Sequence, residues 1–481
     1  MKALKILLAL VVSLAVFAMA LSSCGGNEDN SDSTPSANSS GVSNNGDNVA
    51  SSTVNSGNLD NDDDTNDSGD NTTDKDDTNN SGDDTNGDTN DDTNNNDTNN
   101  NDSNNNDDSG NNEDSNNNGD DAVDESRVVI DNIVYTLDES GTCYYVSEIQ
   151  SGYGESIEIK EECNGKSVVR LVTKLFENIS GVKSISIPKT ITEIEYRCFA
   201  NCSDLTSISV AQENTVYKSI DGNLYSFDEE TLIVYAIGKT SESFVVPESV
   251  HKIDDYAFKD CTAIKNIQFS SKLYGIGSYA FEGCANLTDV VFPSSLNTLG
   301  TAAFASCTSI ETITITRNLE VSAFAFAYCT SLKEILVDEH NYRYSSIDGN
   351  LYYVDKPCVL VQYALGKEDT HFDIPDYVTE IGDAAFCGAE NLVSISTGDS
   401  RDRAISNIGN QAFRDCINLE SIFINEGINQ MGIRVFAGCE KLTIYCEKSE
   451  SDIEMQISVR KWSAIWNPDD CPVEYDYVAS K

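Results

Sequence analysis

The sequence predicts a solenoid of short repeats, with a parallel β-sheet running along the stack. Aromatic, thiol and aliphatic residues recur three positions apart, as in Phe199, Cys202, Leu205 and Ile208. Where copies are adjacent, most successive Phe residues lie 23 residues apart. A fixed period in this range is typical of solenoids, in which each repeat buries its apolar face only against its neighbours.

The motif recurs throughout residues 171–445. Complete copies begin at Phe199, Phe258, Phe281, Phe304, Phe326 and Phe413, and looser copies begin at Phe176, Phe386 and Phe436. In each copy the run from the Leu position onward, such as 205–210, is expected to form a short strand. Stacking would join these strands into one long parallel sheet, with about 4.8 Å between neighbours.

The second half of each repeat follows a different rule. It reads Pro-x2-Val-x2-Ile-x4-Phe, as in Pro247, Val250, Ile253 and Phe258. An apolar residue at every third position matches neither the two-residue period of a strand nor the 3.6-residue period of a helix. We therefore expect tight turns and short 3₁₀-like segments in this half.

The repeats resemble the BspA-like leucine-rich repeats of bacterial surface proteins, whose consensus is close to I-P-x-S-V-T-x-I-G-x-x-A-F-x-x-C-x-x-L-x-x-I. Residues 377–386 (YVTEIGDAAF) and 299–307 (LGTAAFASC) match this consensus closely. Ile179 and Ala389 depart from it by replacing the repeat Cys. The resemblance implies adhesion to host extracellular proteins or to other cells, without catalysis.

Two insertions, near residues 214–238 and 341–366, interrupt the array and are near-copies of each other. Each contains Asp-Gly between apolar residues, which is a strong signal for a two-residue hairpin turn. We expect β-hairpins that ride on the stack rather than separate domains. Their tyrosines are expected to pack in the core, with ligand contact as the alternative.

Both ends of a solenoid need a cap, because a bare coil exposes its apolar face. Residues 126–170 contain β-type runs and are expected to cover the first coil. Residues 446–481 are expected to cover the last. Trp462 and Trp466 lie in this second cap at helical spacing, and packing is the favoured role over ligand contact.

Residues 1–23 have the layout of a lipoprotein signal peptide, with a basic start and then an apolar run. They end in Leu-Ser-Ser before Cys24, which resembles the bacterial lipobox. That resemblance implies cleavage before Cys24, lipidation of this residue and a location on the bacterial cell surface. The lipid would then be the only part of the protein that contacts the membrane. The alternative is an ordinary cleaved signal with a chance Cys.

Residues 24–125 predict a disordered, acidic tether. After Cys24 this linker holds 28 acidic residues against one basic residue, and it has no aromatic residue. Such a composition buries too little apolar surface to offset the entropy of ordering. Acidic clusters such as 62–64 offer loose binding of divalent ions as an alternative role, but a plain spacer is favoured.

The chain carries a formal net charge of −49, and residues 126–481 are acidic as well. Without a basic stripe to neutralise phosphates, nucleic acid is an unsuitable partner. The three histidines lie in no catalytic or zinc-binding motif. No enzymatic activity, cofactor or metal is expected.

Seven of the fifteen cysteines occupy the repeat position. Free Cys is a small residue that buries readily, so a ladder of buried free thiols is favoured. Disulfides between Cys143 and Cys163, or between Cys446 and Cys471, remain alternatives for the caps.

The strand residues that alternate with the apolar ones should face outward. Extended solenoid sheets commonly serve as binding surfaces, although a solvated face is the simpler interpretation for any single residue. The candidate partner-binding residues are Val291, Leu336, Phe423, Asn266, Gln268, Asp289 and Glu334. The leading hypothesis is adhesion through protein partners. The alternatives are glycan capture and a purely structural role in the cell envelope.

Overall fold

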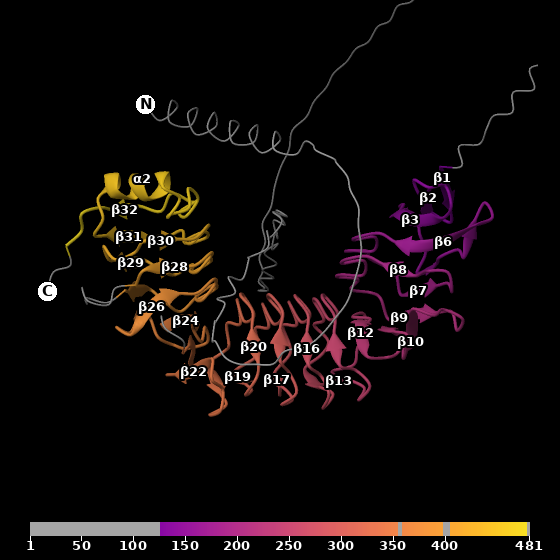
Figure 1. Ribbon diagram of the computed structural model, residues 1–481, viewed down its shortest axis with the longest axis horizontal. Coiled ribbons are helices and arrows are strands. Elements are labelled where there is room, and N and C mark those ends of the chain that lie inside the picture. Colours follow the sequence, from indigo (N-terminus) through magenta and orange to yellow (C-terminus); the bar gives the residue numbers. More distant parts are fainter. Residues whose placement is uncertain (1–125, 355–357, 398–404, 479–481) are drawn as a thin grey trace, which may run out of the picture. The chain divides into compact units, whose positions relative to one another are not determined.

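The computed structural model describes residues 126–354, 358–397 and 405–478 (Figure 1). These residues form the predicted solenoid, and its successive coils pair in parallel through two separate ladders of strands. The signal segment, Cys24 and the acidic linker lie outside the described residues.

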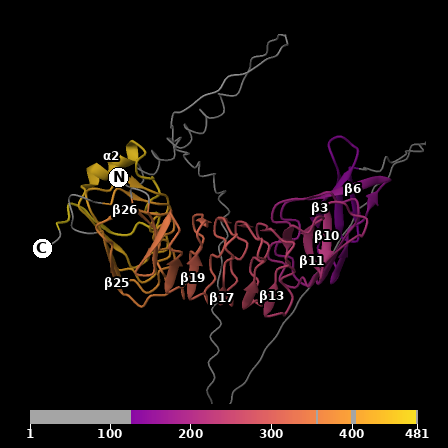
Figure 2. The same ribbon diagram turned by 60° about the horizontal axis from the view of Figure 1, so that its bottom comes forward.

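Ladder A contains the strands that follow the Phe-Cys-Leu part of each repeat, as predicted, and several of them run side by side in Figure 2. It is divided into four sheets. These are β4 (Ser156–Glu158), β7 (Ser184–Ile187) and β9 (Ser207–Val210); β13 (Ser243–Val245), β15 (Asn266–Gln268) and β17 (Asp289–Val290); β19 (Thr312–Ile315) and β21 (Glu334–Val337); and β25 (His371–Asp373), β27 (Ser394–Ser396), β29 (Ser421–Ile424), β31 (Thr443–Cys446) and β32 (Val473–Glu474).

Ladder B corrects the expectation of a single sheet, because the Pro-Val-Ile half of each repeat also contributes a strand. Most of these strands are two to five residues long. So short a strand does not show the alternation of apolar and polar residues by which strands are recognised in a sequence. They are β3 (Tyr144–Ile149), β6 (Lys166–Leu171) and β8 (Glu193–Ile194); β12 (Thr231–Val234), β14 (Lys252–Ile253), β16 (Gly275–Ile276), β18 (Thr298–Leu299) and β20 (Glu320–Val321); and β24 (Cys358–Gln362), β26 (Val378–Ile381), β28 (Asn407–Ile408) and β30 (Gln430–Met431). A short β5 (Glu162–Cys163) pairs antiparallel with β6.

The predicted hairpins are present, and a third one precedes the array. The three hairpins are β1 (Arg127–Ile130) with β2 (Ile133–Leu137), β10 (Tyr217–Ile220) with β11 (Asn223–Ser226), and β22 (Tyr344–Ile347) with β23 (Asn350–Tyr353). Each pairs antiparallel with the first strand of a ladder B sheet, and each of these pairings has a bulge at the same relative position. A buried Tyr follows every bulge: Tyr135, Tyr225 and Tyr352. The N-terminal hairpin is therefore a third copy of the inserted unit.

The two inserted units are built into the stack rather than resting on it. The Gly222 carbonyl accepts a 2.8 Å hydrogen bond from the amide of Ile208, at the end of one ladder A sheet. The Tyr217 hydroxyl accepts a 3.0 Å bond from the amide of Ile194, at the end of a ladder B sheet. In the second unit, Gly349 and Tyr344 make the same contacts. Each unit therefore ends one block of coils and starts the next.

A column of aromatic rings runs through the interior of the coils. The rings of Phe258, Phe281 and Phe304 stack with centroids 4.7 and 4.9 Å apart. Tyr235 and Tyr363 take the Phe position in the inserted units and stack on Phe258 and Phe386. This confirms the predicted internal columns, whose buried apolar surface is the main stabilising contribution.

The repeat cysteines form a second column beside the rings. In most coils the thiol donates a hydrogen bond to the carbonyl of the Phe one coil earlier, as Cys307 does to Phe281 at 3.1 Å. The same bond recurs at Cys202, Cys284, Cys329, Cys416 and Cys439. Every described cysteine is a free thiol, so the alternative disulfides do not form. Cys471 instead donates to the Cys439 carbonyl.

Two backbone requirements explain the small residues of the motif. A Cβ at Gly300 would lie 2.4 Å from the backbone nitrogen of Ser278 in the previous coil. Each coil also turns at two left-handed residues, two positions before and two after the Phe, as at Tyr256 and Asp260. Asn, Asp and Gly recur at the second of these positions because they tolerate this conformation best.

The C-terminal segment continues the stack before it caps it. β32 extends ladder A in parallel with β31. The only described helix is α2 (Glu450–Ser458), which a capping box begins through Ser449 and Asp452. Trp462 and Trp466 lie beyond α2 rather than on a helix, and both are buried, which confirms their expected packing role. No helix of the described residues has the length and hydropathy to span a membrane.

The N-terminal segment likewise forms part of the solenoid stack as well as covering its end. Parallel pairing already begins at β3 with β6 and at β4 with β7, inside the residues expected to be a cap. The β1–β2 hairpin covers the start of ladder B.

Candidate binding surface

Six of the seven candidate residues lie on or directly after strands of two ladder A sheets. Asn266 lies opposite Asp289 on the neighbouring strand, and Gln268 lies opposite Val245. In the next sheet Leu336 lies opposite Thr314, two residues beyond Glu334. We call this set, together with Val291, the ladder A row.

The apolar members of the row are exposed. Val291 is 79% exposed and Leu336 is 40% exposed. Val245, at 62%, belongs to the same row and was missed by the sequence analysis, because the insertion replaces the motif in front of it. Its position 23 residues before Gln268 is the signal that could have found it. Asn266, Gln268 and Asp289 are also exposed.

The seventh candidate lies elsewhere and is half-buried. Phe423 belongs to β29, in a different sheet of ladder A. Its ring packs against Tyr477 at a centroid distance of 6.0 Å, and it pairs across the ladder with Tyr445. The expectation of an outward-facing anchor is thus only partly met, because the C-terminal segment folds back over this strand.

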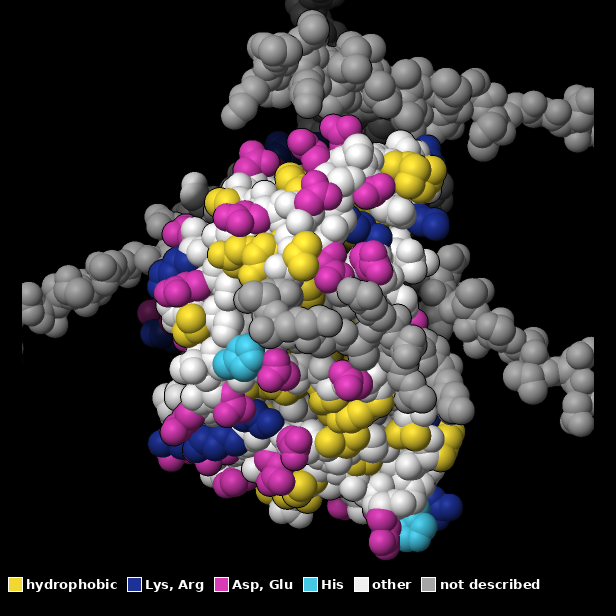
Figure 3. All heavy atoms as spheres, turned by 90° about the vertical axis from the view of Figure 1, so that its left-hand side faces the viewer, with side chains coloured by type: hydrophobic (Ala, Val, Ile, Leu, Met, Phe, Trp, Pro, Cys, Tyr) yellow, Lys and Arg dark blue, Asp and Glu magenta, His cyan; other side chains and the backbone are white. Residues whose placement is uncertain are grey.

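Ion pairs between coils flank the row. Lys265 Nζ lies 2.7 Å from Glu242 Oε1, and Lys333 Nζ lies 3.2 Å from Glu311 Oε1. The four side chains are 48–66% exposed, so each pair contributes at most about 1 kcal/mol. Acidic, basic and apolar side chains are likewise interspersed on the end face shown in Figure 3.

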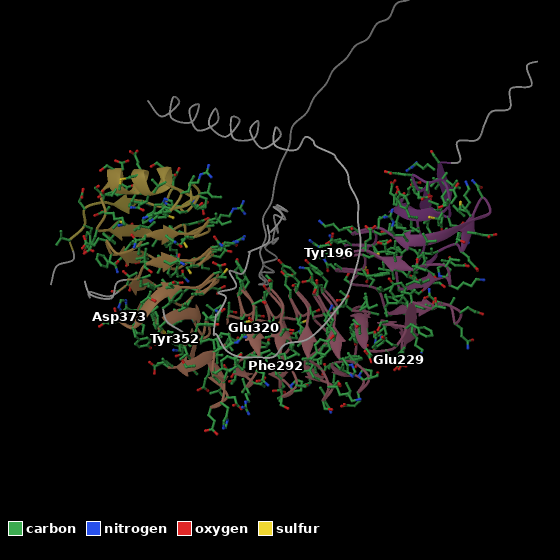
Figure 4. The ribbon with its side chains drawn as sticks, viewed as in Figure 1. Tyr196, Glu229, Phe292, Glu320, Tyr352 and Asp373 are labelled. Carbon is green, nitrogen blue, oxygen red and sulfur yellow. The ribbon has the colours of Figure 1, made fainter. Side chains whose placement is uncertain are left out.

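The hairpin tyrosines are buried or partly buried, with Tyr217 and Tyr353 in the second group. Tyr225, Tyr344 and Tyr352 are buried, as the packing interpretation predicted, and Figure 4 labels Tyr352 within the stack. Burial raises the pKa of Tyr225 to about 12, which reflects the poor solvation available to a phenolate there. These rings offer no surface to a ligand.

A Ser-His-Asp arrangement lies on an open strand face. His371 Nδ1 is 2.7 Å from Ser394 Oγ, and His371 Nε2 is 3.0 Å from Asp373 Oδ1. The His371 and Asp373 side chains are 51% and 76% exposed. Catalytic triads depend on a water-excluded site with preorganised donors, and these groups remain in solvent. Within the described residues, no cluster of His, Cys, Asp and Glu has metal-binding geometry.

Comparison with solved structures finds bacterial proteins of the same class at low similarity. A leucine rich cell surface protein from Faecalibacterium prausnitzii is 22% identical, with 73% of this chain and 95% of that chain covered and a TM-score of 0.40. A leucine-rich repeat protein from Eubacterium ventriosum is 18% identical, with 67% and 78% covered and a TM-score of 0.38. The pneumococcal vaccine antigen PcpA is 18% identical, with 74% and 99% covered and a TM-score of 0.32.

No curated protein matches the chain. The family model for the BspA type leucine rich repeat region matches six copies, over residues 150–231, 235–353 and 366–456. These residues make up more than half of the sequence and coincide with the coils of ladders A and B. The chain therefore belongs to the BspA type leucine-rich repeat family.

Proposed function

We propose that this protein is a bacterial cell-surface adhesin that binds host extracellular proteins, or proteins on other cells, through the ladder A row. The exposed apolar side chains of Val245, Val291 and Leu336 carry this proposal. Val245 and Leu336 stand on strands that parallel pairing holds in place, and Val291 directly follows β17, so binding requires little ordering of the backbone. Apolar anchors within a polar rim are the usual composition of a protein interface.

The predictions for the N-terminal residues complete the proposal. Lipidation of Cys24 would anchor the chain, and the acidic linker would hold the solenoid away from the membrane. A flexible chain of that length spans about 50–60 Å, and charge repulsion extends it further. Labelling with a radioactive fatty acid tests the anchor, because Cys24→Ala should abolish incorporation. Protease added to intact cells tests the location, since an inward-facing protein would survive.

The alternatives are glycan capture and a structural role in the envelope. Tyr225, Tyr344 and Tyr352 are buried, so these three rings offer no aromatic surface to a glycan.

A binding screen of the full chain against immobilised host matrix proteins tests the proposal. We expect saturable binding that Val291→Asp and Leu336→Asp each weaken. Val129→Asp is a matched control, because Val129 is 46% exposed but lies on the N-terminal hairpin. Saturable binding to sugars alone, or equal binding by all three variants, would contradict the proposal.

A further inference from the structure

The surface of ladder B contains a hollow, which is formed by the other half of the repeat from the ladder A row. It lies where β14, β16 and β18 meet and has a volume of about 200 Å³. Its lining includes Lys252, Asp255, Tyr274, Gly275, Ser278 and Thr298. Drug-sized ligands occupy roughly 300–1,000 Å³, so this space suits a single small ring.

The hollow exists because Gly275 lacks a side chain. Strand pairing places Gly275 between Lys252 and Thr298, the residues at the equivalent positions of the neighbouring coils. The stack does not require glycine there. An added Cβ would come no closer than 3.2 Å, to the rotatable hydroxyl of Thr298, whereas at Gly277 it would lie 2.5 Å from a backbone nitrogen. A strand glycine without such a role often marks the close approach of a ligand.

Tyr274 offers an uncovered aromatic face beside the hollow. The side chain is 51% exposed and pairs with no other ring among the described residues. The nearby tyrosines differ, because Tyr196, Tyr256 and Tyr279 cover one another with centroids 5.1 and 5.0 Å apart. Figure 4 labels Tyr196.

Hydrogen-bonding groups complete the lining. Asp255 Oδ1 accepts the amide of Ser278 at 2.7 Å, which fixes the carboxylate. Its other oxygen, and the hydroxyls of Ser278 and Thr298, have no protein partner within the described residues. Lys252 Nζ is held 2.7 Å from Asp254 Oδ1. The hollow thus combines one aromatic face with unpaired acceptors and donors.

We propose that this hollow binds one neutral sugar ring of a glycan. The electron-rich face of Tyr274 attracts the C–H face of a pyranose. Asp255 accepts a sugar hydroxyl through a charge-assisted hydrogen bond, and the Ser278 and Thr298 hydroxyls bind the neighbouring ones. The carboxylate disfavours anionic ligands, and one carboxylate is too few for a calcium site. The proposal is independent of the protein-binding role, because it uses another ladder and other residues.

Saturation-transfer NMR on the full chain tests the proposal, with the methyl glycosides of glucose, galactose, mannose and N-acetylglucosamine as probes. At least one glycoside should receive saturation, mainly on the protons of one ring face. Tyr274→Ala should raise the Kd at least about tenfold, because it removes the stacking contact. Gly275→Val should do the same by filling the hollow, and an unchanged unfolding midpoint would show that it folds.

Tyr342→Ala is the matched control, since Tyr342 is 66% exposed but lies outside the hollow, and its Kd should equal that of the parent. The proposal is overturned if none of the four glycosides binds, or if Tyr274→Ala and Gly275→Val bind as tightly as the parent. Neither result would contradict the proposed protein binding through the ladder A row. The Tyr274→Ala variant should still bind any matrix protein that the parent binds.

Discussion

Replacing Gly300 with Ala should destabilise the stack, whereas the same change at Gly275 should not. A Cβ at Gly300 would lie 2.4 Å from Ser278 N and 2.5 Å from the Gly277 carbonyl carbon. Backbone atoms cannot rotate away, so the two coils must separate locally. Overpacking of this kind costs about 1–3 kcal/mol.

At Gly275 the nearest atom to an added Cβ is the Thr298 hydroxyl, at 3.2 Å. The side chain can rotate, and replacing a strand glycine with Ala recovers about 0.5–1 kcal/mol of backbone entropy. We therefore expect the two variants to differ by about 1.5–4 kcal/mol in the free energy of unfolding. Urea unfolding followed by circular dichroism measures the difference. Equal midpoints, or a more stable Gly300→Ala variant, would refute the close stacking at Gly300.

Three further predictions follow from the core and the surface. Phe304→Ala should lower the free energy of unfolding by about 3–5 kcal/mol in the same urea assay, because it interrupts the ring column; a loss below about 1 kcal/mol would show that the rings are not packed. Lys265→Ala should lower the free energy of unfolding by at most about 1 kcal/mol, since its ion pair with Glu242 is exposed. A larger loss would contradict the small contribution assigned to this ion pair. Burial raises the pKa of the Cys329 thiol from 9.0 to about 12, so the unfolded chain ionises first as pH rises. Stability should be intact below pH 9 and fall between pH 9 and 12, and thermal midpoints that stay level across this range would disagree.

The solenoid and its columns could be predicted because every coil repeats the same packing requirement. Phe281 and Phe304 must stack on their neighbours, so their spacing appears directly in the sequence. The Asp-Gly turns were equally visible, because Asp221 and Gly222 both adopt positive φ, as this turn type requires.

Other features leave weaker signals. The N-terminal hairpin turns at Asp131 and Asn132, both with positive φ, so the same turn occurs without the Asp-Gly signature. Ladder B strands such as β16 contain only two residues. The stacking of successive coils brings these strands together, and the sequence shows no alternation of apolar and polar residues that would reveal them. The repeat pattern separates Gly300, at the consensus Gly position, from Gly275, but it does not show how much room an added Cβ would have at Gly275.

Residue-resolved alkylation of the native protein with iodoacetamide tests the central claim of stacked coils most directly. Cys143 and Cys358 are partly exposed, and the other described cysteines are buried. The account predicts that Cys143 and Cys358 are modified first, and that the column thiols, such as Cys284 and Cys307, react only after unfolding. Rapid labelling of the column thiols in the native state, or their loss to disulfides, would contradict it.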